Sequence, residues 1–131
     1  MTHTLQIFPA GHFEAEAEAP HILTLSNDAN PREADLAGVN TVVLHFPLFS
    51  DGRAFSQSHL LRRRLGFEGD IRATGDVLID QLQQMQRSGF SQAVLRADQD
   101  LEHGRQLLSL YAAFYQGDAV NIQPLFATET A

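Results

Sequence analysis

The sequence predicts an α/β fold with a small, mainly parallel sheet and flanking helices, and the order of its segments is the basis of that prediction. From residue 41 onward, short apolar runs alternate with amphipathic segments in the order β-α-β-α-β-α-β. Alternation of this kind is typical of parallel sheets joined by right-handed crossovers. The repeat, roughly 25 residues, is short for βαβ units, so the layers must be compact. A small open sheet and part of a barrel both fit, whereas a full eightfold barrel needs a longer chain.

The strands of this region are predicted from short apolar runs. The run at 41–46 is rich in β-branched residues and typical of a strand buried on both faces. Pro47 ends it, because proline cannot donate to a sheet ladder. Further strands are expected at 70–73, 92–95 and 119–122.

The first two helices are predicted from capping and turn residues. Ser56 or Ser58 can cap a helix that ends just before Gly66, which sits where a C-terminal cap is expected. A second helix opens at 74–76 and stops at 88–89, and its apolar residues recur at i, i+4 and i+7. Both helices therefore present one apolar side to a sheet.

Acidic residues are natural N-caps for the later helices. Asp76 stands where the second helix opens, and Asp98 or Asp100 can begin the third. Each such cap stabilises a helix by roughly 1 kcal/mol. The third helix is expected to close at 117–118, before the last strand.

The first forty residues are expected to form an appendage, 1–40, of the same unit as the α/β domain at 41–131. Strands are predicted at 5–8 and 21–25, and an acidic, alanine-alternating stretch at 14–20 is interpreted as a solvated linker or edge segment. This part of the chain is acidic, with Arg32 as its sole basic residue.

Composition excludes several classes of function. The chain has 131 residues and a net charge of −7, which argues against nucleic-acid binding. It lacks a membrane-length apolar run and a basic flank followed by an apolar block, so we expect a cytoplasmic protein without a membrane segment. Cysteine is absent, which excludes disulfides, thiol nucleophiles and thiolate-bound clusters. The six histidines show no usual metal-ligand spacing, so we expect neither a metal nor a cofactor.

Arginine supplies all the basic charge of this chain, because lysine is absent. Arginine binds planar anions in a bidentate manner. The absence of lysine removes Schiff-base chemistry and the lysine of phosphate-binding loops. Compositional bias of the source genome is the alternative explanation.

Three turns that carry arginine and aspartate define the candidate site. They lie at 51–53, 72–76 and 96–98; the first and third follow predicted strands, and the second overlaps the end of the one at 70–73. The ends of parallel strands meet at one sheet edge, where open α/β folds bind ligands. Unpaired N–H groups of helix N-termini and the three arginines would suit a phosphate, sulfate, sulfite or carboxylate there. The alternative is structural: the arginines pair with the aspartates across neighbouring loops.

Two further groups of residues have the same double interpretation. Asp80 lies one turn beyond Asp76, so both carboxylates could hold Mg²⁺ through water, or could simply complement the helix dipole. The arginines at 62–64 point around a helix, either into solvent or toward an acidic partner. A solvated face is the simpler interpretation of that run.

Several short blocks, in order, resemble a bacterial family of unknown function. They lie at 49–56, 61–69, 71–78, 80–82 and 89–90, and the resemblance covers about residues 45–115. Members of that family are typically encoded beside assimilatory sulfite reductase and sulfate-reduction genes. They are often labelled as oxidoreductases of sulfite reduction, although this chain has no dinucleotide-binding fingerprint.

The resemblance implies an accessory role in assimilatory sulfite or sulfate reduction, with a partner enzyme such as sulfite reductase, or a small anion, bound at the strand-end edge. It brings no established catalytic residues. The candidate binding residues are those that lie in or beside the first two turns: Asp51, Gly52, Arg53, Ser56, Arg72, Thr74, Gly75, Asp76, Asp80 and Gln81. We expect Arg96 and Asp98 to be scaffolding.

Two other functions stay open on the sequence alone. The same arginines could bind a phosphorylated or sulfonated metabolite in a small enzyme, with Asp76 or Asp80 as acid, base or metal ligand. A homo-oligomer could instead form through exposed phenylalanines, for which Phe46, Phe49 and Phe126 are candidates.

Overall fold

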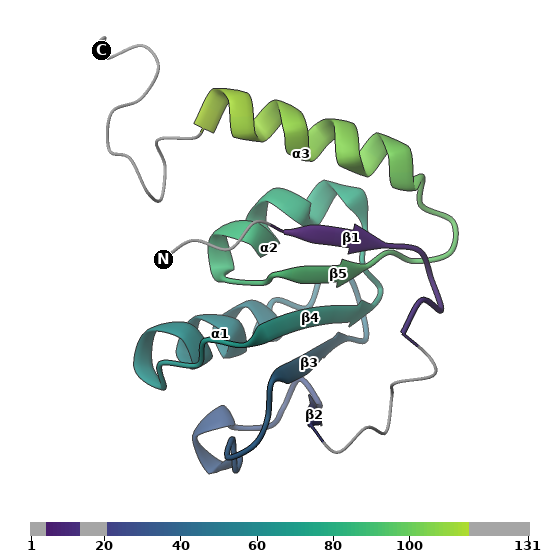
Figure 1. The fold of residues 1–131 in the computed structure, drawn as a ribbon. Coiled ribbons are helices and arrows are strands. Elements are labelled where there is room, and N and C mark those ends of the chain that lie inside the picture. Colours follow the sequence, from purple (N-terminus) through teal and green to yellow (C-terminus); the bar gives the residue numbers. More distant parts are fainter. Residues whose placement is uncertain (1–4, 14–20, 116–131) are drawn as a thin grey trace, which may run out of the picture.

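The protein folds around an open, all-parallel sheet of five strands in the order β1-β5-β4-β3-β2 (Figure 1). The computed structural model describes residues 5–13 and 21–115. The strands are β1 Gln6–Phe8, β2 Ile22–Leu25, β3 Thr41–Phe46, β4 Asp70–Gly75 and β5 Gln92–Val94. The parallel α/β architecture is confirmed. Because β1 and β2 end the sheet on opposite sides, the sheet is open and not part of a barrel.

The helices follow β3, β4 and β5 in turn. They are α1 Arg53–His59, which continues into a π-helical turn at Leu60–Arg64, α2 Leu82–Ser88, which follows a 3₁₀ turn at Ile79–Gln81, and α3 Leu101–Tyr115. A separate 3₁₀ turn, Pro31–Glu33, lies between β2 and β3. Among described residues, the alternation predicted from residue 41 is present as far as α3; the predicted strand at 119–122 and the helix end at 117–118 lie outside them.

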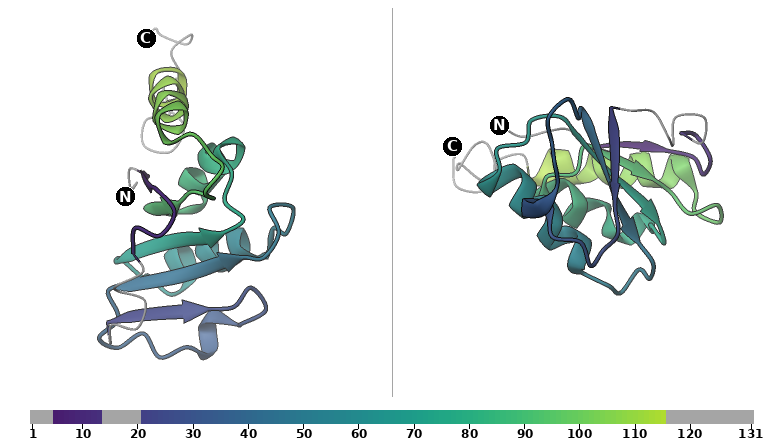
Figure 2. Two further views of the ribbon diagram at one scale, coloured as in Figure 1. Left: turned by 90° about the vertical axis from the view of Figure 1, so that its right-hand side faces the viewer. Right: turned by 90° about the horizontal axis from the view of Figure 1, so that it is seen from below.

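The helices gather on one side of the sheet because the chain steps in one direction from β2 to β5. Right-handed crossovers that advance in the same direction fall on the same face. Figures 1 and 2 show α1 and α2 on that face, with α3 beyond α2 and beside β1. The opposite face of the sheet has no helix against it in the described part of the chain. We call these the helix-covered face and the helix-free face.

The hydrophobic core lies between the sheet and the helices. In β3, Val42, Leu44 and Phe46 are fully buried on the helix-covered face, and Phe46 packs against the rings of Phe55 and Phe90. Ile71 and Ala73 on β4 and Ala93 on β5 face the same way and belong to the same cluster. Alternation along a strand sends each intervening residue to the helix-free face.

The first forty residues supply both edge strands. The strands predicted at 5–8 and 21–25 are present, and each pairs in parallel: β1 with β5 and β2 with β3. Leu5, Ile7 and Leu25 enter the core cluster. Gly104 lets α3 approach closely, since a Cβ there would lie 2.9 Å from Ile7 Cδ1.

The first helix begins earlier than predicted. Its N-cap is Gly52, not Ser56 or Ser58, and no side chain caps it. The Ser58 hydroxyl instead donates to the Ser88 carbonyl oxygen at 2.8 Å, which joins α1 to α2. Gly66 adopts φ +68°, as expected for a residue just past a helix end.

The second helix begins later than predicted because β4 is longer. β4 pairs with β3 residue by residue as far as Phe46 opposite Gly75, so 74–75 are strand and not the opening of a helix. Asp76 is therefore not a helix cap. Gly89 ends α2 with φ +106°, as predicted. Asp100 is the cap of α3: its Oδ1 accepts from the backbone N–H groups of Glu102 and His103.

Candidate functional site

The loops that follow the strands meet at one edge of the sheet, as parallel strands require. We call this the strand-end edge. Asn27, in the loop after β2, donates to the carboxylate of Asp51, in the loop after β3. Asp76, in the loop after β4, accepts two hydrogen bonds. Its Oδ2 accepts from the backbone N–H of Phe49, after β3, at 2.7 Å, and its Oδ1 accepts from Arg96, after β5. These three hydrogen bonds join four consecutive loops into one continuous polar network.

Asp51, in the loop after β3, pairs with Arg53, the first residue of α1. Asp51 Oδ1 accepts from the backbone N–H and the Nε–H of Arg53, and Oδ2 accepts from Nη2 at 2.8 Å. The Arg53 guanidinium and these hydrogen bonds lower the pKa of Asp51 from 3.8 to about 2. The Arg53 side chain is 62% exposed, so it lies at the surface with its charge matched by a carboxylate.

Arg96 lies between two carboxylates. Its Nε and Nη2 donate to Asp98, and its Nη1 donates to Asp76. The guanidinium lowers the pKa of Asp98 to about 2 and also lowers that of Asp76, while both carboxylates raise the pKa of Arg96. The pairing across neighbouring loops that the sequence left as an alternative to ligand binding is thus present for Arg96.

Gln81 joins the 3₁₀ turn at Ile79–Gln81 to the loop after β3. Its Oε1 accepts from the Leu78 backbone N–H at 3.1 Å, and its Nε2 donates to the Phe49 carbonyl oxygen. Asp80, its neighbour, is exposed. Gln81 therefore positions the strand-end edge, and the structure places Asp80 in solvent.

Ser56, Thr74 and Gly75 lie beside this network. Ser56 is exposed on α1, and the Thr74 hydroxyl is 3.3 Å from His45 Nδ1. Gly75 adopts φ +95°, and a Cβ there would collide with the Phe46 carbonyl oxygen and the His45 ring. Glycine at 75 is thus required both by the backbone conformation and by the close approach of β3.

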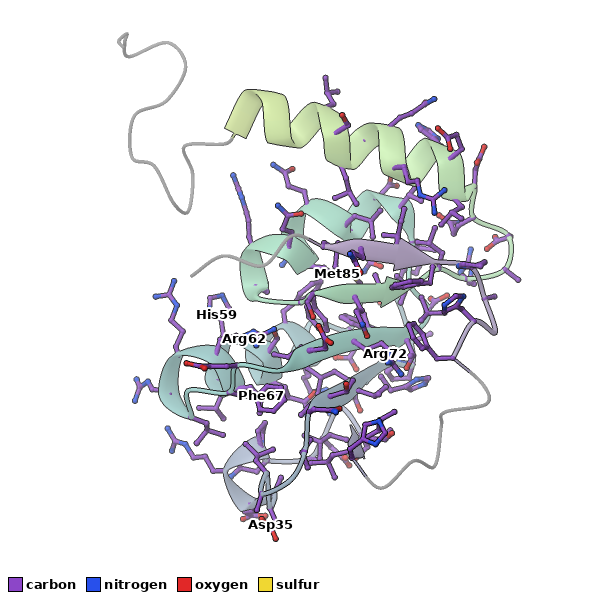
Figure 3. All side chains as sticks on the ribbon, viewed as in Figure 1. Asp35, His59, Arg62, Phe67, Arg72 and Met85 are labelled. Atoms are coloured by element: carbon purple, nitrogen blue, oxygen red, sulfur yellow. The ribbon has the colours of Figure 1, made fainter. Side chains whose placement is uncertain are left out.

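Arg72 is not at the strand-end edge. It is the third residue of β4, opposite Val43 on β3, and faces the helix-free side. Its Nε donates to Gln92 Oε1 at 2.8 Å, and its guanidinium lies 3.5 Å from the Phe13 ring centroid. The predicted convergence of three arginines is therefore wrong: Arg53 begins α1 and Arg96 lies in the loop after β5, both at the strand-end edge. Arg72 lies within the sheet, as Figure 3 shows.

Exposed apolar side chains stand at the same edge. Leu48 and Phe49 are 62% and 52% exposed, and both belong to the loop between β3 and α1. Phe46, another candidate for an oligomer contact, is fully buried in the core, and Phe126 lies outside the described residues. The edge thus combines two adjacent apolar side chains with the charged network around them.

Sequence reasoning missed two residues that shape this part of the molecule. Asn27 ties the loop after β2 to Asp51, and the signal was available, since a strand followed by a polar turn leads to the same edge. Arg62, within the arginine run, donates to the carbonyl oxygens of Phe67, Gly69 and Gly89. Burial lowers the pKa of the Arg62 guanidinium. No sequence signal distinguished Arg62 from its exposed neighbours.

Two kinds of site are absent from the described residues. In 5–13 and 21–115, no group of three or more histidine, aspartate or glutamate side chains is arranged to hold a metal ion. No helix of that same part of the chain is long and apolar enough to cross a membrane.

Fold and site define a small α/β protein with a parallel sheet, helices on one face and a linked set of polar loops at the strand ends. The chain belongs to the family described as Bacterial protein of unknown function (DUF934), whose model matches residues 22–126. No curated protein and no solved structure matches the chain.

Proposed function

We propose that this protein is an accessory protein of assimilatory sulfite or sulfate reduction that binds a partner enzyme through the strand-end edge. The genomic setting in which the resembling family is typically found motivates the pathway. We choose the strand-end edge as the docking surface because the adjacent side chains of Leu48 and Phe49 are exposed there. Adjacent large apolar side chains in water mark interaction sites more often than isolated ones do.

The electrostatics of the edge favour a protein partner over a small anion. Arg53 and Arg96 already hydrogen-bond to carboxylates, so a sulfite or phosphate ion would have to compete with Asp51, Asp76 and Asp98. An apolar centre within a charge-balanced rim is instead the usual composition of a protein interface. The network also fixes the loop backbone, because Phe49 N–H and C=O are both hydrogen-bonded, to Asp76 and Gln81. A fixed loop reduces the entropy lost on binding.

Copurification with sulfite reductase tests the proposal. Tagged protein is isolated from cells that express sulfite reductase, and the yield of the enzyme is measured for the parent chain, for Leu48→Ser with Phe49→Ser, and for Leu110→Ser. Leu110 lies on α3, is 49% exposed and serves as the matched apolar control. We expect the double variant to lose the enzyme and Leu110→Ser to retain it.

Two results would contradict the proposal. One is failure of the parent protein to bring down sulfite reductase or another sulfur-assimilation enzyme, together with unchanged sulfite reduction in cells from which the gene is deleted. The other is retention of the enzyme by the Leu48/Phe49 variant. Circular dichroism of each variant checks the fold, which we expect to be intact because about half or more of each of these side chains is in solvent.

A further inference from the structure

A groove between β1 and α3 lies apart from the strand-end edge (Figure 1). Its volume is about 450 Å³, within the range of ligand-binding clefts. It is lined by consecutive residues along β1 and by two residues of α3: Leu5, Gln6, Ile7, Phe8, Arg105 and Leu108. We call it the edge groove. Neither β1 nor α3 supplies a side chain to the network of the strand-end edge, so docking of an enzyme there leaves the edge groove unused.

The edge groove follows the outer edge of β1 and does not lie over one face of the sheet. Successive residues of a strand point to opposite faces, yet four consecutive residues, 5–8, line the groove. Only the edge of a strand is shared by residues of both faces. β1 is also the last strand on its side of the sheet, so no strand among the described residues pairs with that edge.

The outer edge of β1 presents backbone groups that the ladder with β5 does not use. The Gln6 N–H donates to the Ser91 carbonyl oxygen, and the Phe8 carbonyl oxygen accepts from the Leu95 N–H, each at 2.9 Å. Because the peptide groups alternate in direction along a strand, the N–H and C=O of Ile7 point the other way, toward the edge groove. An edge of this kind is a template for pairing with a further strand.

Two features limit the length of strand that this edge can accept. The Leu5 N–H already donates to Gln86 Oε1 at 3.4 Å, and Pro9 has no N–H to donate. Ile7, midway between Leu5 and Pro9, offers both a donor and an acceptor. The edge therefore suits a short extended segment, and side-chain contacts must add to the few backbone hydrogen bonds.

The side chains that border the edge groove favour a particular kind of segment. Leu5 and Leu108 provide apolar contact surface, and Arg105, which is exposed, is the charged residue of the lining. Within 5–13 and 21–115, no carboxylate forms an ion pair with Arg105. A guanidinium at the mouth of a groove favours a ligand with a carboxylate, which it can bind in a bidentate manner.

We propose that the edge groove binds a short extended segment of another protein, with an acidic residue among apolar ones. The segment adds a strand beside β1 through Ile7, its apolar side chains lie against Leu5 and Leu108, and its carboxylate lies beside Arg105. In this mode of recognition the backbone supplies affinity and the side chains supply selectivity. A second copy of this chain fits less well, because a symmetric contact would bring two Arg105 side chains to the same groove.

The test titrates the full-length chain with the peptide Ac-Thr-Val-Glu-Val-Thr-NH₂ and follows the amides by ¹H–¹⁵N NMR. We expect shifts confined to 5–8 and 105–108, with Ile7 among the largest. The same peptide N-methylated at its three central residues lacks their backbone donors and should not bind. The peptide with glutamine in place of glutamate should bind about threefold more weakly, the size expected for an exposed ion pair.

Two variants separate the charge from its surroundings. Arg105→Gln should weaken the glutamate peptide about threefold and leave the glutamine peptide unchanged. Arg63→Gln removes an exposed arginine of the π-helical turn and should change neither affinity. Both side chains are exposed, so we expect both variants to fold, and circular dichroism checks this.

Four results would overturn the proposal of a peptide-binding edge. The first is the absence of binding by the glutamate peptide at millimolar concentration, and the second is equal binding by its N-methylated form. The third is a set of shifts that map to β2 or to the strand-end edge. The fourth is a dimer, seen by sedimentation without peptide, whose formation shifts the Ile7 amide, because a second copy would then occupy the edge groove.

Discussion

The two faces of the sheet differ in composition and in what packs against them, although the same strands form both. On β3, Val42, Leu44 and Phe46 point to the helix-covered face and are fully buried, whereas Val43 and His45, one residue away, point to the other face. The helix-covered face is uniformly apolar and packed by helices. The helix-free face mixes valine with threonine, histidine and a buried arginine, and keeps an open cavity. The comparison separates the face of the sheet that forms the hydrophobic core from the face that no helix among the described residues covers.

The largest effect is expected on the helix-covered face. Phe46→Ala removes a fully buried ring that contacts Phe55 and Phe90, and should lower the free energy of unfolding by about 3–5 kcal/mol. Urea unfolding followed by circular dichroism measures it. Phe49→Ala is the matched control, since that ring is 52% exposed, and should change the free energy by no more than about 0.5 kcal/mol. Similar losses for the two variants would contradict the burial pattern.

The next effect is expected where β4 ends. Gly75→Ala should cost about 2 kcal/mol or more, because φ +95° is unfavourable for alanine and the added Cβ would meet the Phe46 carbonyl oxygen. Gly66→Ala is the control: its φ of +68° is also positive, but a Cβ there has open space. Thermal and urea unfolding of both variants separate collision from backbone strain. Equal destabilisation would show that the approach of β3 to Gly75 is not tight.

A pair of variants on one strand tests the comparison directly. Val42→Ala and Val43→Ala each remove two methyl groups, from opposite faces of β3. The lost burial of these methyl groups should lower the free energy of unfolding by about 1.6 kcal/mol in each variant. Val42 is closed in by helices, so a cavity adds to its cost, and we expect about 2.5 kcal/mol for it against about 1.5 kcal/mol for Val43. Urea unfolding measures both. A larger loss for Val43→Ala would mean that the helix-free face is the more tightly packed one.

The smallest effect is expected in the strand-end network and depends on pH. The pKa of Asp51 and that of Asp98 are about 2 in the folded protein, below their ordinary 3.8, so the folded state binds fewer protons than the unfolded state as pH falls. Their contribution to stability is present above about pH 4 and is lost as the pH drops toward about 2. Urea unfolding across this range measures the slope.

Variants of Asp51 and Arg53 show how much of this pH dependence of stability comes from their ion pair. Asp51→Asn removes the titrating group, and Arg53→Gln removes the guanidinium that lowers its pKa. Both should flatten the dependence of stability on pH between about pH 4 and about pH 2. An unchanged slope in both variants would show that the Asp51–Arg53 pair is already broken in solution.

Element ends that depend on neighbouring residues in the sequence were predictable. Those that depend on contacts with distant parts of the chain were not. β3 was fixed by its β-branched run and by Pro47, and the end of α2 by Gly89 with its positive φ. The start of α1 was predicted at Ser56 or Ser58, because a serine before an apolar stripe is a good cap. The helix begins at Arg53 instead, and Ser58 is used for a contact with Ser88 that no local rule anticipates.

The candidate site divides in the same way. Asp51 with Arg53 and Asp98 with Arg96 are two residues apart, so their pairing was accessible from sequence. Asp76, predicted as a helix cap, joins Phe49 and Arg96 across two loops. That role depends on which loops become neighbours, which the order of strands decides and the local sequence does not.

The sequence by itself determined a parallel α/β fold, the places where arginine and aspartate follow strands, and the absence of thiol and lysine chemistry. The tertiary structure decided that β4 continues to Gly75 and pairs in register with β3, so that 72–75 are strand and Arg72 lies within the sheet, away from the strand-end edge. The physical reason is the two-residue period of a strand: extent and register set the face to which each side chain points. Those pairings bury Arg72 on the helix-free face of the sheet, whereas Arg53 lies in solvent.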